Sequence, residues 1–287
     1  MQNTLSPKEL ARAIGVSESS LKRWVDEGTV NAIRTFGGHR RIPRNDALAF
    51  VRQQGYPLLR PDLLGLAEAE AGAEAGGAID GVFHAALQEG RAAEAQRLVI
   101  QRFVAGDSVA RLVDEVMAPA MRALGELWQY DQAGIYIEHR AVDICTQILD
   151  RLRALLPDPA PEAPVAVGGA HATDPYTLPS LMAATVIAAE GWRTLNLGAF
   201  VPPGVLTRAV VDQQARLAWL ALGAVEGRRG VDNEVETTLT ALAQAGEPPI
   251  LVAGGPACHC SGHRPPEPAR FAESMPELAG LVRGLPV

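Results

Sequence analysis

The stretch that decides how the N-terminal part folds is Arg34-Thr35-Phe36-Gly37-Gly38-His39-Arg40-Arg41-Ile42-Pro43. Its paired glycines permit the positive φ that a tight turn needs. The flanking residues predict two short strands, over 29–33 and 40–42. We therefore expect a hairpin whose tip is rich in cationic side chains.

Two short helices are predicted before this hairpin. The residues Ser6-Pro7-Lys8-Glu9 have the pattern of a capping box, with a proline suited to the first helical position. Ser17 caps a second helix, over 18–27, which exposes Lys22 and Arg23. Two helices followed by a hairpin form a winged helix-turn-helix, whose second helix reads the major groove of DNA.

The distribution of charge supports DNA binding. The whole chain is acidic, with 26 Lys and Arg against 33 Asp and Glu, yet cations are concentrated between residues 22 and 44. A winged helix presents this part of its surface to phosphates. We expect a double-stranded DNA operator as partner, contacted by Lys22, Arg23, Arg34, Thr35, His39, Arg40 and Arg41.

Residues 4–55 resemble the winged-helix domain of the MerR family of transcriptional regulators. The sequence Arg-Thr-x-Gly-Gly-His-Arg-Arg-Ile at 34–42 carries this resemblance. It implies that the hairpin cations contact the DNA backbone and that Lys22 and Arg23 lie nearest the bases. The long pairing helix of conventional members is missing after residue 55, so we expect a homo-oligomer, dimer or tetramer, assembled through later domains.

Composition bounds the location of the protein. The chain has 287 residues, 47% of them hydrophobic, which suits two or three domains with substantial cores. It contains no run of about eighteen apolar residues and no signal peptide pattern, so we expect no membrane association. Three cysteines, Cys145, Cys258 and Cys260, make no disulfide framework and favour a cytoplasmic location.

The remaining chain divides by composition. We predict a winged-helix DNA-binding domain over 1–60, a flexible acidic linker over 61–78, and a four-helix bundle over 79–157. Apolar runs alternating with helical stretches predict a doubly wound, parallel, Rossmann-like sheet over 163–287. The expected bundle helices are 80–89, 91–104, 108–127 and 134–156; the expected strands are 165–167, 194–197, 218–222 and 250–253, with helices at 179–190, 204–214 and 232–245.

A second resemblance lies in the bundle, where Trp128 is followed after nine residues by Glu138 and His139. This spacing resembles the Trp-x9-Glu-His motif of the light-sensing, cobalamin-dependent CarH/LitR repressors, whose helical cap lies over the upper face of a corrinoid. An indole offers a rigid apolar face, and a Glu-His pair can bond, exchange a proton or ligate a metal. The resemblance implies that these three residues cover the upper face of the cofactor.

Cobalamin-binding α/β domains carry Asp/Glu-x-His-x-x-Gly after the first strand, where the His is the lower cobalt ligand and the Gly makes room for the displaced nucleotide tail. Counting back from Leu197-Gly198 places Asp174 at the acidic position, Tyr176 at the His and Pro179 at the Gly. A phenol is a poor cobalt ligand unless ionised, and its ordinary pKa is about 10. His171, five residues upstream, is an alternative ligand.

Two further elements of that pattern follow later strands. Ser-x-Leu after the third strand is replaced by Ala221-Leu222-Gly223, whereas Gly254 and Gly255 after the fourth are retained. Because ligands of doubly wound sheets bind at the carboxyl ends of the strands, we expect these loops to contact the cofactor.

These features lead us to expect a transcriptional repressor controlled by a tetrapyrrole, of cobalamin type and light-responsive, through a change in oligomeric state. Haem or biliverdin in the same cleft is an alternative, with His139, His171 and Tyr176 as possible axial ligands of a cofactor metal. A cofactor-free interaction domain is another. We do not expect an enzyme, since no second catalytic domain is present and a DNA reader would be unexplained.

The segment Cys258-His259-Cys260 leaves its own alternatives. With His263 it offers part of a zinc site, and one thiol could attach a bilin, but the spacing is not a standard zinc pattern. An exposed loop is the third reading.

Overall fold

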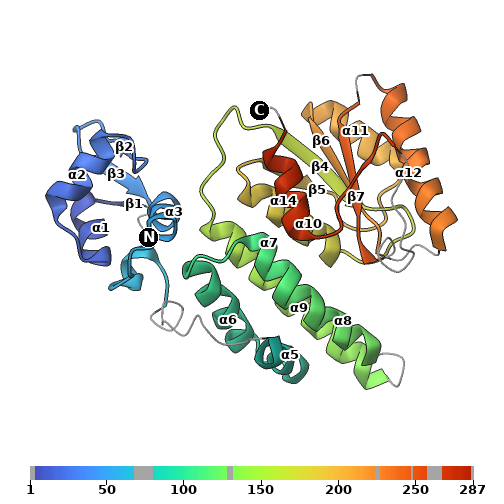
Figure 1. The fold of residues 1–287 in the computed structure, drawn as a ribbon, viewed down its shortest axis with the longest axis horizontal. Helices are drawn as coiled ribbons and strands as arrows, with labels where there is room; N and C mark the ends of the chain where they lie inside the picture. The colour runs from blue at the N-terminus through green and yellow to red at the C-terminus, as the bar shows by residue number, and fades with distance from the viewer. Residues whose placement is uncertain are drawn as a thin grey trace. The chain divides into compact units, whose positions relative to one another are not determined.

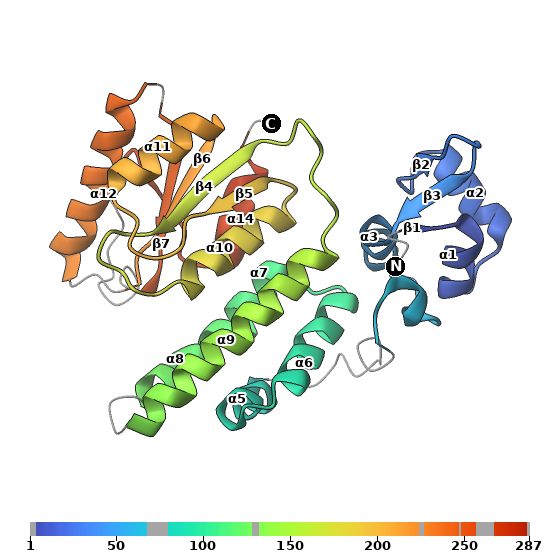
Figure 2. The same ribbon diagram turned by 180° about the vertical axis from the view of Figure 1, so that it is seen from behind.

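The computed structural model describes residues 4–67, 80–127, 132–223, 227–246, 248–256 and 267–285 (Figures 1 and 2). It has two compact units: Met1–Ser108 with Glu115–Asp158, and Val109–Asp114 with Pro159–Val287. None of the helices in the described ranges has both the length and the apolarity needed to cross a membrane.

The N-terminal part of the first unit is a winged helix-turn-helix, as predicted. Its antiparallel sheet has the order β1-β3-β2. Ser6 caps the first helix in a complete capping box, and Ser17 caps the second. The elements are β1 (Thr4–Leu5), α1 (Pro7–Ile14), α2 (Glu18–Asp26), β2 (Ile33–Arg34), β3 (Arg40–Pro43) and α3 (Arg44–Gln54).

The strand predicted over 29–33 is wrong except at its last residue. The amides of Thr29 and Val30 donate to the carbonyl of Trp24, at 2.8 and 3.2 Å, and so close the end of α2. These backbone groups are therefore used by the helix terminus and not by a sheet. Strand β1 and helix α3 were not predicted.

The part of the chain predicted as a linker is ordered at its start. Pro61–Leu64 forms the short 3-10 helix η1, and Leu64 and Leu66 are buried. Residues 68–79, which hold most of the acidic repeat, lie outside the described residues.

The predicted helical bundle is present in the first unit. Its helices are α5 (Asp80–Glu89), α6 (Ala92–Val104), α8 (Ala118–Leu127) and α9 (Gln132–Leu155). The single helix predicted over 108–127 is interrupted: α7 (Val109–Arg111) is followed by a π-helical stretch, Leu112–Met117, before α8 begins. Buried side chains such as Phe83, Phe103 and Leu124 form the interior.

The second unit is a doubly wound parallel sheet, as predicted. Its strand order is β5-β4-β6-β7-β8, so the order reverses between β4 and β6. Helices α10 and α14 pack on one face, and α11 and α12 pack together on the other (Figure 1). The strands are β4 (Val165–Ala170), β5 (Arg193–Asn196), β6 (Leu217–Ala221), β7 (Ile250–Gly254) and β8 (Arg270–Phe271); the helices are α10 (Leu178–Ala189), α11 (Pro203–Gln213), α12 (Gly227–Gln244) and α14 (Met275–Arg283).

One large side chain lies in the layer between this sheet and α10. Trp219 of β6 is buried, and its indole N–H donates to the hydroxyl of Ser180 on α10 at 3.0 Å. Ser180 in turn donates to Asn196 Oδ1 at 2.7 Å. A Cβ added to Gly168 of β4 would lie only 2.1 Å from the indole. The indole therefore rests directly on the backbone of the neighbouring strand.

We predict that Gly168→Ala destabilises the second unit by about 1–3 kcal/mol, because a methyl group there must displace a packed indole. Trp219→Ala alone should cost about 3–5 kcal/mol through the cavity it leaves. The double variant should cost less than the sum of the two, which urea unfolding of the four chains would measure.

Gly204→Ala on α11 is the matched control, since a Cβ at Gly204 meets nothing within 4 Å. Strict additivity of Gly168→Ala and Trp219→Ala would contradict the packing described.

Candidate nucleic-acid interface and ligand-binding edge

The tip of the wing is a closed turn. Thr35 N–H donates to the carbonyl of His39 at 2.9 Å, and Gly38 N–H donates to the carbonyl of Thr35 at 2.8 Å. Gly38 has a φ of 77°, which favours glycine. The Thr35 hydroxyl accepts the His39 N–H at 3.2 Å, so this predicted DNA contact also holds the turn together.

The wing is tied to the recognition helix by Asp26, the last residue of α2. Arg40 donates to its carboxylate through Nε at 3.0 Å and through Nη2 at 2.7 and 2.9 Å. Arg34 Nη2 lies 3.7 Å from the same carboxylate. The side chain of Arg34 is 68% exposed and that of Arg40 is 28% exposed. Arg40 thus orients the wing, while Arg34 is the more accessible cation.

The other predicted DNA contacts lie on the same two elements. Lys22 pairs with Glu18 at 2.8 Å, and Arg23 lies 3.8 Å from Glu27, both one turn away on the surface of α2. Exposed pairs of this kind contribute little to stability, so phosphates can replace the carboxylates at small cost.

Arg41 lies at the base of the wing, with Nη1 4.0 Å from Glu9 Oε2. Hydrogen bonds from Ser6 are the main reason why the pKa of Glu9 is below its ordinary value of 4.5, and Arg41 lowers it further. Glu9 therefore carries its charge at neutral pH and joins the capping box to the wing. His39 is exposed at the other end of the turn.

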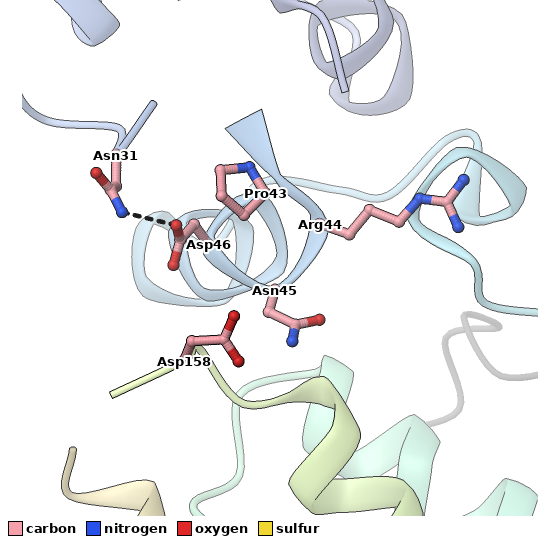
Figure 3. A pocket seen from close by; sticks show the side chains of 6 residues that line it. All are labelled: Asn31, Pro43, Arg44, Asn45, Asp46 and Asp158. Atoms are coloured by element: carbon pink, nitrogen blue, oxygen red, sulfur yellow. Dashed lines mark hydrogen bonds between the residues drawn. The ribbon is translucent and has the colours of Figure 1, made fainter. Parts of the chain in front are cut away.

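A hollow beside α3 is acidic and does not extend the DNA surface (Figure 3). Asn31 donates to Asp46 at 2.7 Å, and Asp158 also lines the hollow. Partial burial raises the pKa of Asp46 above its ordinary 3.8; the Asn31 bond opposes this, and the Asp158 charge adds to it. Arg44 also lines the hollow, so the two carboxylates leave it one net negative charge, which disfavours a phosphate.

Helix α3 is fastened to the bundle within the first unit by Arg52. Its Nε donates to the carbonyl of Phe103 at 2.6 Å and its Nη2 to that of Asp107 at 2.8 Å. Its guanidinium carbon lies 3.6 Å from the centre of the Phe103 ring. Burial lowers the pKa of Arg52 to about 10. These bonds join the winged helix to the C-terminal end of α6.

In the second unit, the buried carboxylate of Asp174 connects the loops that follow β4 and β6. Its Oδ2 accepts the N–H of Gly223 at 2.6 Å, and its Oδ1 accepts the N–H of Tyr176 at 2.9 Å. A Cβ on Gly223 would lie 2.7 Å from Asp174 Oδ2. Since the strand order reverses between these strands, the carboxylate lies where doubly wound sheets bind ligands.

His171 is buried next to this carboxylate. Its Nε2 lies 3.7 Å from Asp174 Oδ2 and has no hydrogen-bond partner within the described part of the chain. Its Nδ1 lies 3.7 Å from an oxygen of Glu234 on α12 and accepts the N–H of Thr173 at 3.4 Å. To ligate a metal, the imidazole would have to leave these surroundings.

Tyr176 follows in the same loop, and its side chain is on the surface. It is 44% exposed, although its backbone is held by Asp174. The structure thus brings Asp174 and His171 together and leaves the phenol of Tyr176 facing solvent. Glu234 was not predicted, because it lies far away in the sequence on a helix without a motif.

The two glycines at the end of β7, Gly254 and Gly255, are required by the packing of the strand ends. A Cβ on Gly254 would lie 2.6 Å from the carbonyl oxygen of Ala272, and one on Gly255 would lie 2.6 Å from that of Leu222. Gly255 also has a φ of 140°. Close backbone contact accounts for both glycines, and their predicted contact with a cofactor stays a prediction.

Two of the three predicted upper-face residues lie on α9 of the bundle. Glu138 is half-buried and His139 exposed on α9, while Trp128 lies outside the described residues. Cys258, His259, Cys260 and His263 also lie outside them. Cys145 is buried in α9, and this burial raises the pKa of its thiol to about 12. Within the described ranges, no three His, Cys, Asp or Glu side chains are grouped to hold a metal ion.

A corrinoid bound with a lower imidazole and an inserted nucleotide tail does not fit the second unit. The residue at the ligand position is Tyr176, and Pro179 stands where the resemblance requires a glycine to make room for the tail. The next residue, Ser180, is fully buried and bonded to the indole of Trp219. The side chain next to this position is therefore already bonded within the protein's own core.

Comparison with protein families finds two matches. Residues 4–55 match the helix-turn-helix domain family, and residues 82–153 match the B12 binding domain family. The second match covers the bundle. No curated protein matches the chain. The helix-turn-helix prediction is confirmed at this level, and the MerR and CarH resemblances stay predictions.

Solved structures with similar folds include three corrinoid-related proteins. A monomethylamine corrinoid protein of Methanosarcina barkeri has 14% identity and a TM-score of 0.47, over 70% of this chain and 95% of that one. A cobalamin-binding protein of Desulfitobacterium hafniense has 17% identity and a TM-score of 0.33, over 70% and 95%. The methanol:cobalamin methyltransferase complex MtaBC of M. barkeri has 13% identity and a TM-score of 0.38, over 94% and 93%.

The chain therefore combines a helix-turn-helix domain, helices of the B12 binding domain family and a doubly wound parallel sheet.

We predict that Arg34→Ala reduces the slope of log affinity against log salt by about 0.9, because one phosphate contact is lost, and leaves stability unchanged. Arg40→Ala should weaken binding and also lower stability by up to about 1 kcal/mol, since it releases the wing from Asp26. Salt titrations with a short mixed-sequence duplex, together with thermal unfolding, measure both. An unaltered salt slope in Arg34→Ala would contradict the assignment.

Asp174→Asn is expected to destabilise the second unit by about 1–3 kcal/mol. The amide has one acceptor oxygen, so its NH2 group would face one of the two N–H donors. Asp212→Asn, on the surface of α11, is the control and should change stability by less than about 0.5 kcal/mol. Equal unfolding midpoints for the two variants would show that Asp174 does not connect the loops.

Proposed function

We propose that this protein is a one-component transcriptional regulator whose winged helix binds double-stranded DNA and whose bundle and sheet respond to a corrinoid. The observation that carries the DNA half is the cationic wing held against α2 by the Arg40–Asp26 pair. The observation that supports the ligand class is the match of residues 82–153 to the B12 binding domain family.

The proposed mode of ligand binding follows from the position of Trp219 in the layer beneath α10. Because Trp219 occupies the space beside Ser180, the ligand would keep its nucleotide tail outside this layer. Tyr176 would not serve as its lower ligand, since a neutral phenol is a weak donor to cobalt. The chemistry that a bound corrinoid would supply is a cobalt centre whose upper ligand can be exchanged or released by light.

Residues of the bundle would transmit the state of the bound ligand to the winged helix. Glu138 and His139 on α9 are accessible for contact with the ligand. Arg52 joins the winged helix to α6, which packs against α9. A ligand that favours one arrangement of the bundle would change DNA affinity by linkage. We propose repression as the output, with light and oligomeric state as the controlling variables, on the strength of the Trp-x9-Glu-His resemblance.

We further propose that the protein regulates and does not catalyse. A corrinoid methyltransferase would transfer a methyl group from a donor to the bound cofactor, and a winged helix would have no use in such a reaction. Methyl transfer to the purified, corrinoid-loaded protein would contradict this part of the proposal.

We predict that cobalamin and cobinamide, which lacks the nucleotide tail, shift DNA affinity by the same factor. Affinity for a duplex selected by the protein from a random library is measured with each corrinoid, with haem and with biliverdin, in darkness and after illumination. Haem and biliverdin should leave it unchanged.

A change in DNA affinity with haem or biliverdin alone would show that this tetrapyrrole, and not a corrinoid, is the ligand. A response to cobalamin without one to cobinamide would show that the tail is bound. If the protein selected no duplex from the library, the DNA-binding part of the proposal would be wrong.

A further inference from the structure

The most exposed large apolar side chain in the described structure is Phe36, at the tip of the wing. Its relative exposure is 113%, whereas the next in the described ranges, Tyr136, reaches 62%. Fully burying a phenylalanine side chain is worth about 1.5–3 kcal/mol. The wing therefore presents a ring that gains free energy when a partner covers it.

The position of this ring is fixed by the closed turn around it. The Thr35–His39 and Gly38–Thr35 backbone bonds bracket Phe36 on both sides, and the Thr35 hydroxyl adds a third bond. Asp26 then fixes the hairpin through Arg40. A ring on such a turn loses little conformational freedom when it binds, because its backbone is already ordered.

The surroundings of Phe36 indicate what kind of partner would cover it. Arg34 and His39 are exposed on either side of the tip, and Arg40 follows. The partner must therefore offer an apolar slot between two negatively charged rims. The minor groove of double-stranded DNA has this form, with phosphates along both edges and base steps at its floor. Ile33, in the same hairpin, is also exposed, at 53%, but two side chains are still too small an apolar area for a protein interface or a membrane surface.

We propose that Phe36 enters the minor groove of the operator as an apolar wedge between two base pairs, with Arg34 and His39 on the phosphates beside it. This inference rests on the proposed DNA-binding function and adds a contact that bends the duplex. Wedges of this kind unstack flexible steps most readily, so the operator should carry a pyrimidine–purine step, such as TA, beneath each wing.

The test compares the full-length wild-type chain with Phe36→Ala and Phe36→Leu on a duplex selected by the wild-type chain. Phe36→Ala should weaken binding roughly tenfold, equivalent to about 1.4 kcal/mol, while Phe36→Leu retains most of the affinity. The salt slope should not change, because no charge is removed. Fluorescence of 2-aminopurine placed at the step beneath a wing should rise on binding of the wild-type chain and not with Phe36→Ala.

Two controls separate the possible causes of weak binding. Phe36 has no buried contacts to lose, so the thermal unfolding midpoint of Phe36→Ala should equal that of the wild type. Val211→Ala, at an exposed apolar position on α11, should leave DNA binding unchanged.

If Phe36→Ala bound DNA with wild-type affinity and gave the same rise in 2-aminopurine fluorescence as the wild type, the proposed wedge would be wrong, although DNA binding itself would stand. An altered sedimentation coefficient of Phe36→Ala without loss of DNA affinity would instead assign the ring to a protein contact. Failure of the wild-type chain to select any duplex would overturn the proposed function itself.

Discussion

The contact between the indole of Trp219 and the backbone of Gly168 is the constraint on which the account of the ligand-binding half depends. The absence of a side chain at Gly168 lets the indole lie on β4, and the bond to Ser180 fixes it against α10. For this reason we propose that a corrinoid binds here without inserting its tail.

Buried polar groups fix the edge of the sheet. Asp174 accepts N–H groups from two loops, and Gly223 has no Cβ because the carboxylate occupies that space. The imidazole of His171 lies beside it with an unpartnered Nε2. In the other unit, Asp26 similarly holds two arginines and Arg52 joins reader to bundle. A few charged groups thus define the geometry that a ligand or DNA would meet.

Local signals in the sequence were sufficient to predict the winged helix and the general architecture of the other domains. Capping at Ser6 and Ser17, the paired glycines of the wing and the alternation of strands and helices depend on neighbouring residues. The long-range contacts could not be predicted this way. No local pattern in the sequence pairs Trp219 with Gly168 or His171 with Glu234. Strands β1 and β8 are only two residues long, which is too short for an alternating pattern. Helices α3 and α14 were also not predicted. The replacement of the expected His and Gly by Tyr176 and Pro179 did indicate that the usual cobalamin mode was in question.

The most direct test of the central claim is the visible absorption spectrum of cobalamin bound to the full-length protein. We expect the spectrum, in the wild type and in His171→Ala alike, to stay that of cobalamin with its own nucleotide base on cobalt, because the buried Trp219–Ser180 pair occupies part of the layer beneath α10. A shift to the spectrum of the base-off form upon binding would show that the nucleotide base has left the cobalt and is free to enter the protein, and would contradict this expectation.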